Sequence, residues 1–249
     1  MAGAARRRDG HVTQERMLEE AMTAIAEDGL SSLTMSALAE RLGTSGGHIL
    51  YYFGSKDLLL LAALRWSESA LAEERRALLS RRITAERKLD RFLRLYLPRG
   101  PRDPRWTLWI ELWARTPGNS ALGEAQEELD RGWHEDLETL LTAGVARRRF
   151  APLDAGARAS ELLALLDGLS TRVVLGQESG RDPRPALEVA RSAVRALIAP
   201  YASGADGEPS VGADAPDAAD GEPSVSGDSS DGAAGGPSVT DNAPDSAAS

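Results

Sequence analysis

Residues 34–56 constrain the fold of this chain more than any other segment, because short helical patterns alternate there with glycine breaks. Thr34 can cap an amphipathic helix, which Gly43 ends. Ser45 then begins a second short helical pattern that closes near Tyr51. The segment therefore predicts two short helices joined by a tight turn, the layout of a helix-turn-helix.

Helical periodicity continues through the first 202 residues. No window alternates convincingly with a period of two, so we expect an all-α protein. Glycines and prolines separate the helical patterns, which cover residues 13–28, 56–79, 85–97, 105–115, 120–146, 154–176 and 185–201.

The net charge of −9 is unevenly distributed along the chain. Residues 203–249 contain eight Asp, two Glu and neither Lys nor Arg, which leaves +1 on the preceding 202 residues. This acidic segment is rich in small residues, and residues 206–211 return as 220–225. It has too few apolar residues to offset the entropy of ordering, so we expect a disordered tail.

The composition argues against an enzyme, a cofactor site and a metal site. The chain has no cysteine, and its three histidines are scattered. His134-Glu135 lacks the second histidine of a zinc peptidase helix, and no glycine-rich phosphate loop is present. No signal peptide and no apolar run of membrane-spanning length is visible, so we expect a cytoplasmic protein.

The second short helix carries residue types that suit DNA recognition. Its first turn, Ser45 to His48, offers a hydroxyl, two glycines for close backbone approach and an imidazole that can donate or accept hydrogen bonds. Tyr51, Tyr52 and Lys56 can contact phosphates, and Phe53 is expected in the core. Arg6, Arg7 and Arg8 form a basic arm that can touch the DNA backbone or the minor groove.

Residues 13–66 resemble the DNA-binding domain of TetR-family transcriptional repressors. The resemblance rests on Thr34, Leu38-Ala39, Gly43, Ser45 with Gly47, Tyr51-Tyr52-Phe53 and Lys56. Two positions depart from the family pattern: Leu50 replaces a tyrosine and Thr44 replaces a valine. The DNA-binding residues that follow from pattern and resemblance are Thr34, Ser45, Gly46, Gly47, His48, Tyr51, Tyr52 and Lys56.

The segments Trp109-Ile-Glu-Leu-Trp113 and Leu166-Asp-Gly-Leu169 are similar to the regulatory domain of the BetI-like branch. The resemblance implies that the last two helices pair two protomers in a four-helix bundle. The expected interface residues are Leu162, Leu165, Leu166, Leu169, Val173, Leu187, Val194, Leu197 and Ile198. Periodicity alone leaves an alternative open, in which these stripes close the core of the monomer.

Four of the five tryptophans lie within 28 residues: Trp106, Trp109, Trp113 and Trp133. The cluster can line a pocket for an apolar or cationic effector, with Glu111 or Glu135 supplying negative charge. Ordinary core packing is the alternative, and it is commoner for aromatic residues at helical spacing.

The chain therefore divides into a flexible basic arm (1–12), a helix-turn-helix DNA-binding domain (13–66), a helical regulatory and dimerisation domain (67–202) and an acidic tail (203–249). The expected function is that of a repressor, which binds a palindromic DNA operator as a homodimer and is released by a small-molecule effector. An activator, or a helical ligand-binding dimer that does not act as a repressor, is the alternative.

Overall fold

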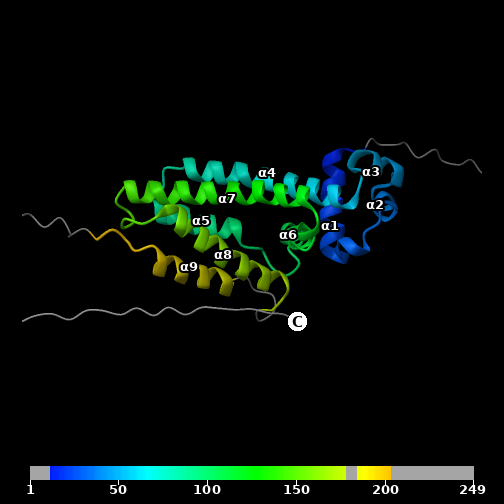
Figure 1. Cartoon of the computed structure of the whole chain (residues 1–249). Helices are drawn as coiled ribbons and strands as arrows, with labels where there is room; N and C mark the ends of the chain where they lie inside the picture. Colours follow the sequence, from blue (N-terminus) through cyan, green and yellow to red (C-terminus); the bar gives the residue numbers. More distant parts are fainter. Residues whose placement is uncertain (1–11, 178–183, 203–249) are drawn as a thin grey trace, which may run out of the picture. The chain divides into compact units, whose positions relative to one another are not determined.

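The computed structural model describes residues 12–177 and 184–202, which adopt an all-helical fold (Figure 1). Most of the predicted basic arm and the whole predicted acidic tail lie outside the described residues. Within the described part of the chain, no helix is both long and apolar enough to cross a membrane.

The N-terminal helices gather around the first turns of a long helix. They are α1 (Gln14–Ser32), α2 (Met35–Leu42), α3 (Gly46–Phe53) and the start of α4 (Lys56–Ser80). A buried apolar core that includes Met17, Ile25, Leu38, Ile49 and Phe53 joins them. Phe53 is thus a core residue, as the sequence predicts.

Side-chain caps define where these helices begin. Thr13, Thr34, Ser45 and Ser55 each accept a hydrogen bond from the backbone N–H three residues further on. Each cap of this kind stabilises a helix by about 1 kcal/mol. The cap at Ser45 fixes the start of α3 and hence the direction in which its first turn points.

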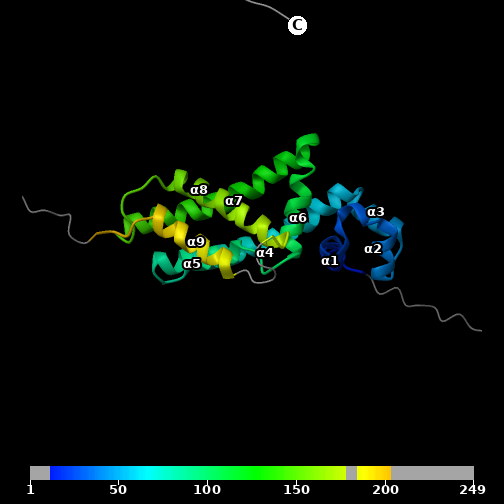
Figure 2. The same ribbon diagram turned by 90° about the horizontal axis from the view of Figure 1, so that it is seen from below.

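Of the remaining helices, α5, α6 and α7 pack against α4, and α8 and α9 pack on the other side of them (Figures 1 and 2). The helix α7 runs beside α4, while α5 and α8 pack against α7, and α9 lies between α5 and α8. Their bounds are α5 (Ala85–Tyr96), α6 (Pro104–Trp113), α7 (Ser120–Ala146), α8 (Ala155–Val174) and α9 (Arg184–Leu197), with a 3-10 turn η1 (Thr116–Gly118) before α7.

The last predicted helix is shorter than expected. It ends at Leu197 rather than at residue 201, because the following residues bond to the turn between α7 and α8. The N–H of Ala151 donates to the carbonyl of Ala199 at 2.9 Å, and the N–H of Tyr201 donates to the carbonyl of Arg149 at 3.1 Å. The prediction that this helix continues to residue 201 is wrong. Helical periodicity does not reveal that the residues after Leu197 pair with the turn between α7 and α8.

The packing of α8 corrects part of the predicted dimer surface. Leu162, Leu166, Leu169 and Val173 of α8, and Ile198 after α9, are buried inside the subunit. Within the subunit, α8 packs against α6, α7 and α9, so these side chains belong to the core of the single subunit. The other four residues of the prediction are partly exposed: Leu165, Leu187, Val194 and Leu197.

Candidate DNA-binding surface and effector site

The helix α3 presents its first turn and one side to solvent. Ser45 uses its hydroxyl to cap the helix, accepting from the N–H of His48 at 3.2 Å. The Nδ1 atom of His48 lies 2.8 Å from the Thr44 hydroxyl, which leaves Nε2 as the ring atom for an outside partner. Thr34 similarly caps α2, so its direct role in this structure is to fix the start of that helix.

The two glycines at the start of α3 lie in different surroundings. A Cβ at Gly46 would approach the Ser36 hydroxyl to 3.3 Å, so Gly46 allows α3 to cross α2 closely. A Cβ at Gly47 would meet no atom within 4 Å. Of the two predicted positions for close backbone approach, only Gly47 faces open space.

An exposed apolar and aromatic surface continues along α3. Leu50 is 49% exposed and Tyr51 is 84% exposed. Tyr52 is 39% exposed and stacks edge-on against the rings of His48 and Tyr51. Large side chains left exposed on a short helix suit contacts with thymine methyl groups and DNA phosphates.

The cations near α3 are partly engaged inside the protein. Arg41 donates to Glu20 and Glu27 of α1, and these hydrogen bonds raise its pKa. The Lys56 ammonium lies 3.4 Å from the carbonyl of Leu30 and 3.2 Å from that of Ser31. Lys56 thus ties the start of α4 to the end of α1, and its positive charge stays beside α3.

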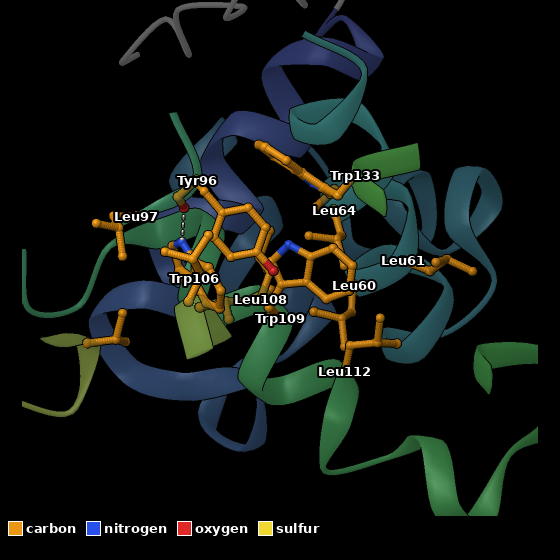
Figure 3. Packing of buried hydrophobic residues seen from close by; sticks show 14 of the residues in the cluster. Leu60, Leu61, Leu64, Tyr96, Leu97, Trp106, Leu108, Trp109, Leu112 and Trp133 are labelled. Atoms are coloured by element: carbon orange, nitrogen blue, oxygen red, sulfur yellow. Dashed lines mark hydrogen bonds between the residues drawn. The ribbon is translucent and has the colours of Figure 1, made fainter. Parts of the chain in front are cut away.

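The tryptophan cluster is largely buried between α4, α6 and α7 (Figure 3). Trp106, Trp109 and Trp133 are each less than 5% exposed, whereas Trp113 is partly exposed. Tyr96, which was not predicted from the sequence, also belongs to this cluster. The centre of its ring lies 4.7 Å from the centre of the Trp133 ring and 5.5 Å from that of Trp106. The four predicted residues therefore form one aromatic group together with Tyr96.

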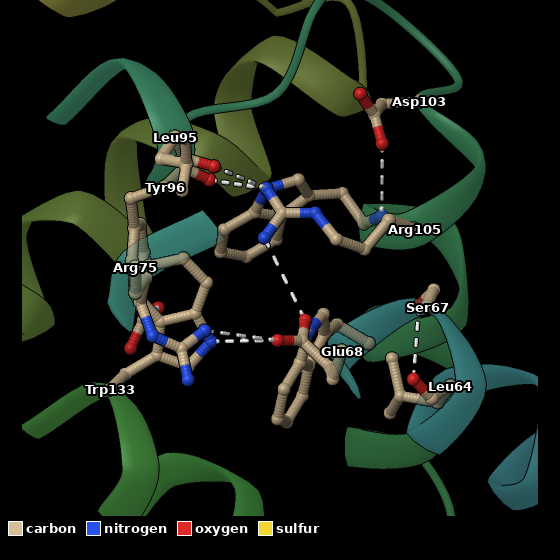
Figure 4. Close-up of polar contacts among 12 residues, drawn as sticks. Leu64, Ser67, Glu68, Arg75, Leu95, Tyr96, Asp103, Arg105 and Trp133 are labelled. Carbon is tan, nitrogen blue, oxygen red and sulfur yellow. Dashed lines mark hydrogen bonds and ion pairs between the residues drawn. The ribbon is translucent and has the colours of Figure 1, made fainter. Parts of the chain in front are cut away.

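A buried carboxylate organises this group (Figure 4). Glu68 of α4 accepts hydrogen bonds from the indole N–H groups of Trp109 at 2.8 Å and Trp133 at 2.9 Å. Arg75 and Arg105 each place a guanidinium nitrogen 3.7 Å from Glu68. Burial disfavours a charge without a partner, so these contacts hold the rings and the arginines in fixed positions.

The aromatic group already holds a cation. The guanidinium carbon of Arg75 lies 3.9 Å from the centre of the Trp133 ring, and that of Arg105 lies 5.4 Å from the centre of Trp106. These distances are typical of cation–π contacts. The rings thus lie in an arrangement that stabilises positive charge.

Only a small void of about 10 Å³ remains among the rings, but an open hollow of about 370 Å³ adjoins it. Trp113, Asp130 and Asp167 line both spaces. The other walls of the hollow are Thr116, Pro117 and Gln126, so no Lys or Arg of the described part of the chain lines it. The mouth of the tryptophan cluster is therefore aromatic on one side and acidic on the other.

Burial raises the pKa values of the two carboxylates at this mouth. Desolvation raises the pKa of Asp167 to about 6, although Asp167 accepts a hydrogen bond from the Tyr96 hydroxyl at 2.5 Å. Burial also raises the pKa of Asp130. A positive ligand beside these carboxylates would favour their ionised form and gain from their charge.

The acidic partners that the sequence suggested lie elsewhere. Glu111 accepts from the N–H of Leu30 at 3.0 Å and pairs with Arg115, while Glu135 lies on an exposed part of α7. Asp130 and Asp167 take their place at the mouth. Asp130 precedes Trp133 by one helical turn, and that spacing is the sequence signal that could have identified it.

Two family models match this chain. Residues 17–63 match the model described as bacterial regulatory proteins of the tetR family, and residues 85–199 match the C-terminal domain of BetI-type transcriptional repressors. The regulator BetI of Burkholderia mallei is 30% identical over 196 residues, which cover 76% of this chain and 95% of that protein. The chain belongs to the TetR family, with a BetI-type C-terminal domain.

Solved structures agree with this assignment. A transcriptional regulator from Saccharomonospora viridis, solved in complex with choline, is 27% identical with a TM-score of 0.68, covering 74% of this chain and 96% of that one. A TetR-family regulator from Rhodococcus sp. is 26% identical with a TM-score of 0.59, covering 73% and 96%. The TetR family consists of transcriptional regulators rather than enzymes, which agrees with the expectation from composition.

The family assignment locates both candidate sites. In this TetR-family regulator, α3 lies within the matched N-terminal segment, and the aromatic group lies within or beside the BetI-type domain. Glu68 and Arg75 on α4 fall between the two matched segments. One helix therefore connects the DNA-binding domain to the candidate effector site.

Proposed function

We propose that this regulator is a repressor, which binds a palindromic operator as a homodimer and releases it when a quaternary ammonium compound binds at the tryptophan cluster. Choline is the first candidate because the similar regulator from S. viridis was crystallised with it. The observation that carries the proposal is the mouth formed by Trp113, Asp130 and Asp167, which combines an aromatic face with two carboxylates.

The DNA-binding part of the proposal rests on the exposed side of α3. Gly47 permits close approach of the backbone, and His48 has a ring nitrogen available for a base edge. Tyr51 and Tyr52 project hydroxyl groups beside them, where phosphates of a bound duplex would lie. A single short helix reads few base pairs, so a symmetric dimer is needed for useful specificity.

The effector part rests on the chemistry of the cluster. A quaternary ammonium group is attracted to tryptophan faces and to carboxylates, and it needs no hydrogen-bond acceptor. The void among the rings is too small for such a group, whereas the adjoining hollow is large enough. Entry beyond the hollow therefore requires the rings on α6 to separate from those on α7 and α5.

Movement of α6 would reach the DNA-binding domain through two polar contacts. Glu111 accepts a hydrogen bond from the N–H of Leu30 in α1, just after Gly29, where φ is 78°. Arg115 bridges Glu111 at 2.5 Å and Asp57 of α4 at 3.3 Å. Both contacts lie at the helix that carries three of the four clustered tryptophans, so effector binding and the position of the DNA-binding domain are coupled.

The dimer part of the proposal uses the partly exposed apolar residues of α8 and α9. Leu165, Leu187, Val194 and Leu197 are the predicted interface residues that stay partly exposed, and Val189, which is 46% exposed, lies on the same helix as three of them. Pairing this surface with its copy would bury apolar area that the single subunit leaves in water.

Calorimetric titration with choline tests the effector site directly. We expect one binding event per chain, weakened about ten-fold in Asp130→Asn and in Asp167→Asn, because each change removes one charge from the mouth. Glu135→Gln is the matched control, since Glu135 is exposed on the same helix as Asp130 and lines neither space. The Glu135→Gln variant should bind choline with the same affinity as the native chain.

The neutral isostere 3,3-dimethyl-1-butanol provides a second comparison, because it keeps the shape of choline without the charge. Binding of this alcohol as tightly as choline would contradict the proposed cation site. So would choline binding that is equally strong in Asp130→Asn, Asp167→Asn and the native chain.

A further inference from the structure

A second cavity, of about 580 Å³, lies between α5 and α9. Its apolar lining, called the apolar floor below, consists of Leu89 and Leu93 of α5 with Val194, Ile198 and Phe150. It shares no lining residue with the tryptophan cluster or the hollow beside it. A volume of this size is typical of pockets that hold small ligands.

One wall of this cavity is formed by Phe150. The ring of Phe150 lies directly against Gly144 of α7, where an added Cβ would come within 2.2 Å of the ring. A backbone bridge joins Phe150 to Pro200, which also lines the cavity. The wall of the cavity at Phe150 is therefore tightly packed against α7.

The mouth of the pocket carries charges that are mostly compensated. Glu86 pairs with Arg149 at 2.8 Å, and Asp90 accepts from both Arg191 at 2.7 Å and Arg94 at 3.0 Å. These contacts lower the pKa of Asp90, so its carboxylate stays ionised and engaged. Both acids at the mouth already have cationic partners.

Arg195 differs from the other arginines at this mouth. Among the described residues, no hydrogen bond or ion pair engages its side chain, although it lines the pocket one turn after Arg191. An anion at the mouth would meet this unpaired guanidinium, whereas a cation would meet carboxylates that are already compensated.

We propose that this pocket binds an amphipathic monocarboxylate, with its alkyl chain on the apolar floor between α5 and α9 and its carboxylate on Arg195. The apolar floor and the single unpaired cation at its edge, among the described residues, match a ligand of that chemistry. The site is separate from the cation site of the proposed function, so each can be tested without the other.

The experiment is a titration of the full chain with decanoate below its micelle concentration, followed by calorimetry and by the melting temperature. We expect one site per chain and a raised melting temperature, since a ligand that binds only the folded state stabilises it. Arg195→Gln should weaken decanoate binding about ten-fold, because it removes one charge-assisted hydrogen bond. Arg195 is exposed, so this variant should fold normally.

Arg76→Gln is the matched control, because Arg76 is also exposed and lines neither this pocket nor the two spaces at the tryptophan cluster. 1-Decanol, with the same chain and no charge, should bind this pocket at least about ten-fold more weakly than decanoate. Choline affinity should be unchanged in Arg195→Gln, which separates this site from the tryptophan cluster.

Three results would overturn the proposal. They are the absence of decanoate binding, equal decanoate affinity in Arg195→Gln and the native chain, and binding of 1-decanol as tight as that of decanoate. If decanoate does not bind and Arg195→Gln instead changes the oligomeric state in sedimentation, a second copy of the chain covers the pocket and the ligand proposal is wrong.

Discussion

Neighbouring residues of one chemical type have different roles in this protein. Gly46 and Gly47 follow each other in the sequence, yet only Gly46 is packed against α2 and only Gly47 faces open space. The sequence predicted that both glycines lie in the first turn of α3 and allow close approach of the backbone to DNA. Which glycine serves packing depends on the crossing of α2 and α3, which is not visible in either helix alone.

The pair gives a matched test of the DNA-binding surface. Gly47→Ala should keep or raise stability, by up to about 1 kcal/mol, because alanine favours helix and its methyl group meets no neighbour. The same methyl group should weaken operator binding by obstructing close approach of the backbone. Thermal unfolding and DNA titration of one preparation would measure both effects.

Gly46→Ala is the control: it should lower the stability of the fold more than it changes the contact between the first turn of α3 and DNA. Its methyl group would crowd Ser36, so the fold should lose stability. If Gly47→Ala binds operator DNA as tightly as the native chain, α3 does not approach DNA through this turn.

Asp167 should make effector binding depend on pH. Burial raises its pKa to about 6, so a proton occupies the carboxylate below that pH and competes with a cationic ligand. Choline affinity should be nearly constant above about pH 7 and fall as the pH drops through about 6, levelling off at roughly the ten-fold lower affinity expected of Asp167→Asn. Calorimetry between about pH 5 and 8 would measure it, and Asp167→Asn should flatten the profile.

At the scale of the elements, α6 connects the two candidate sites. It supplies Trp106, Trp109 and Trp113 to the aromatic group, and it contacts α1 through Glu111. The sequence predicted the tryptophans correctly as one cluster, because their helical spacing places them on neighbouring faces. It misassigned Glu111, since a contact with Leu30 spans 81 residues and no local pattern encodes it.

Glu111→Ala should separate effector binding from DNA release. Removing this carboxylate deletes the acceptor for the Leu30 N–H, while the residues at the mouth of the tryptophan cluster stay in place. We expect choline affinity in the absence of DNA to change little, and the coupling free energy to fall by about 1 kcal/mol. DNA titrations with and without choline give the coupling.

Glu135→Ala is the control for this change, because Glu135 is an exposed glutamate of α7 that lines neither space at the tryptophan cluster. Full choline-induced release in Glu111→Ala would show that the link between α6 and α1 does not transmit the effector signal.

For the whole molecule, local patterns predicted the helices and their order, but not which apolar stripes stay exposed. The α8 stripe reads equally well as core or as interface, and only the packing of α6 and α7 decides that Leu162 and Leu166 are interior. The aromatic group likewise needed Tyr96, Asp130 and Asp167 from three different helices. A sequence pattern indicates which residues share one face of one helix, whereas a binding site combines residues from several helices.

The proposed dimer predicts the effect of a charge on the exposed part of α9. Val189→Glu should leave the subunit folded, because Val189 is 46% exposed, and should convert the dimer to a monomer. Operator affinity should fall with it, since two half-sites are no longer held together. Sedimentation would detect the change, with Thr142→Glu on an exposed part of α7 as the control.

DNA binding by α3 and cation binding at the tryptophan cluster can be tested together in one measurement. The full chain is bound to a fluorescent operator selected from random DNA, and choline is then added while anisotropy is recorded. We predict a palindromic selected sequence and release by choline, with roughly a five- to 150-fold loss of affinity, which corresponds to the usual range of about 1 to 3 kcal/mol for such coupling. Anisotropy that stays constant at choline concentrations shown to saturate the protein would contradict it.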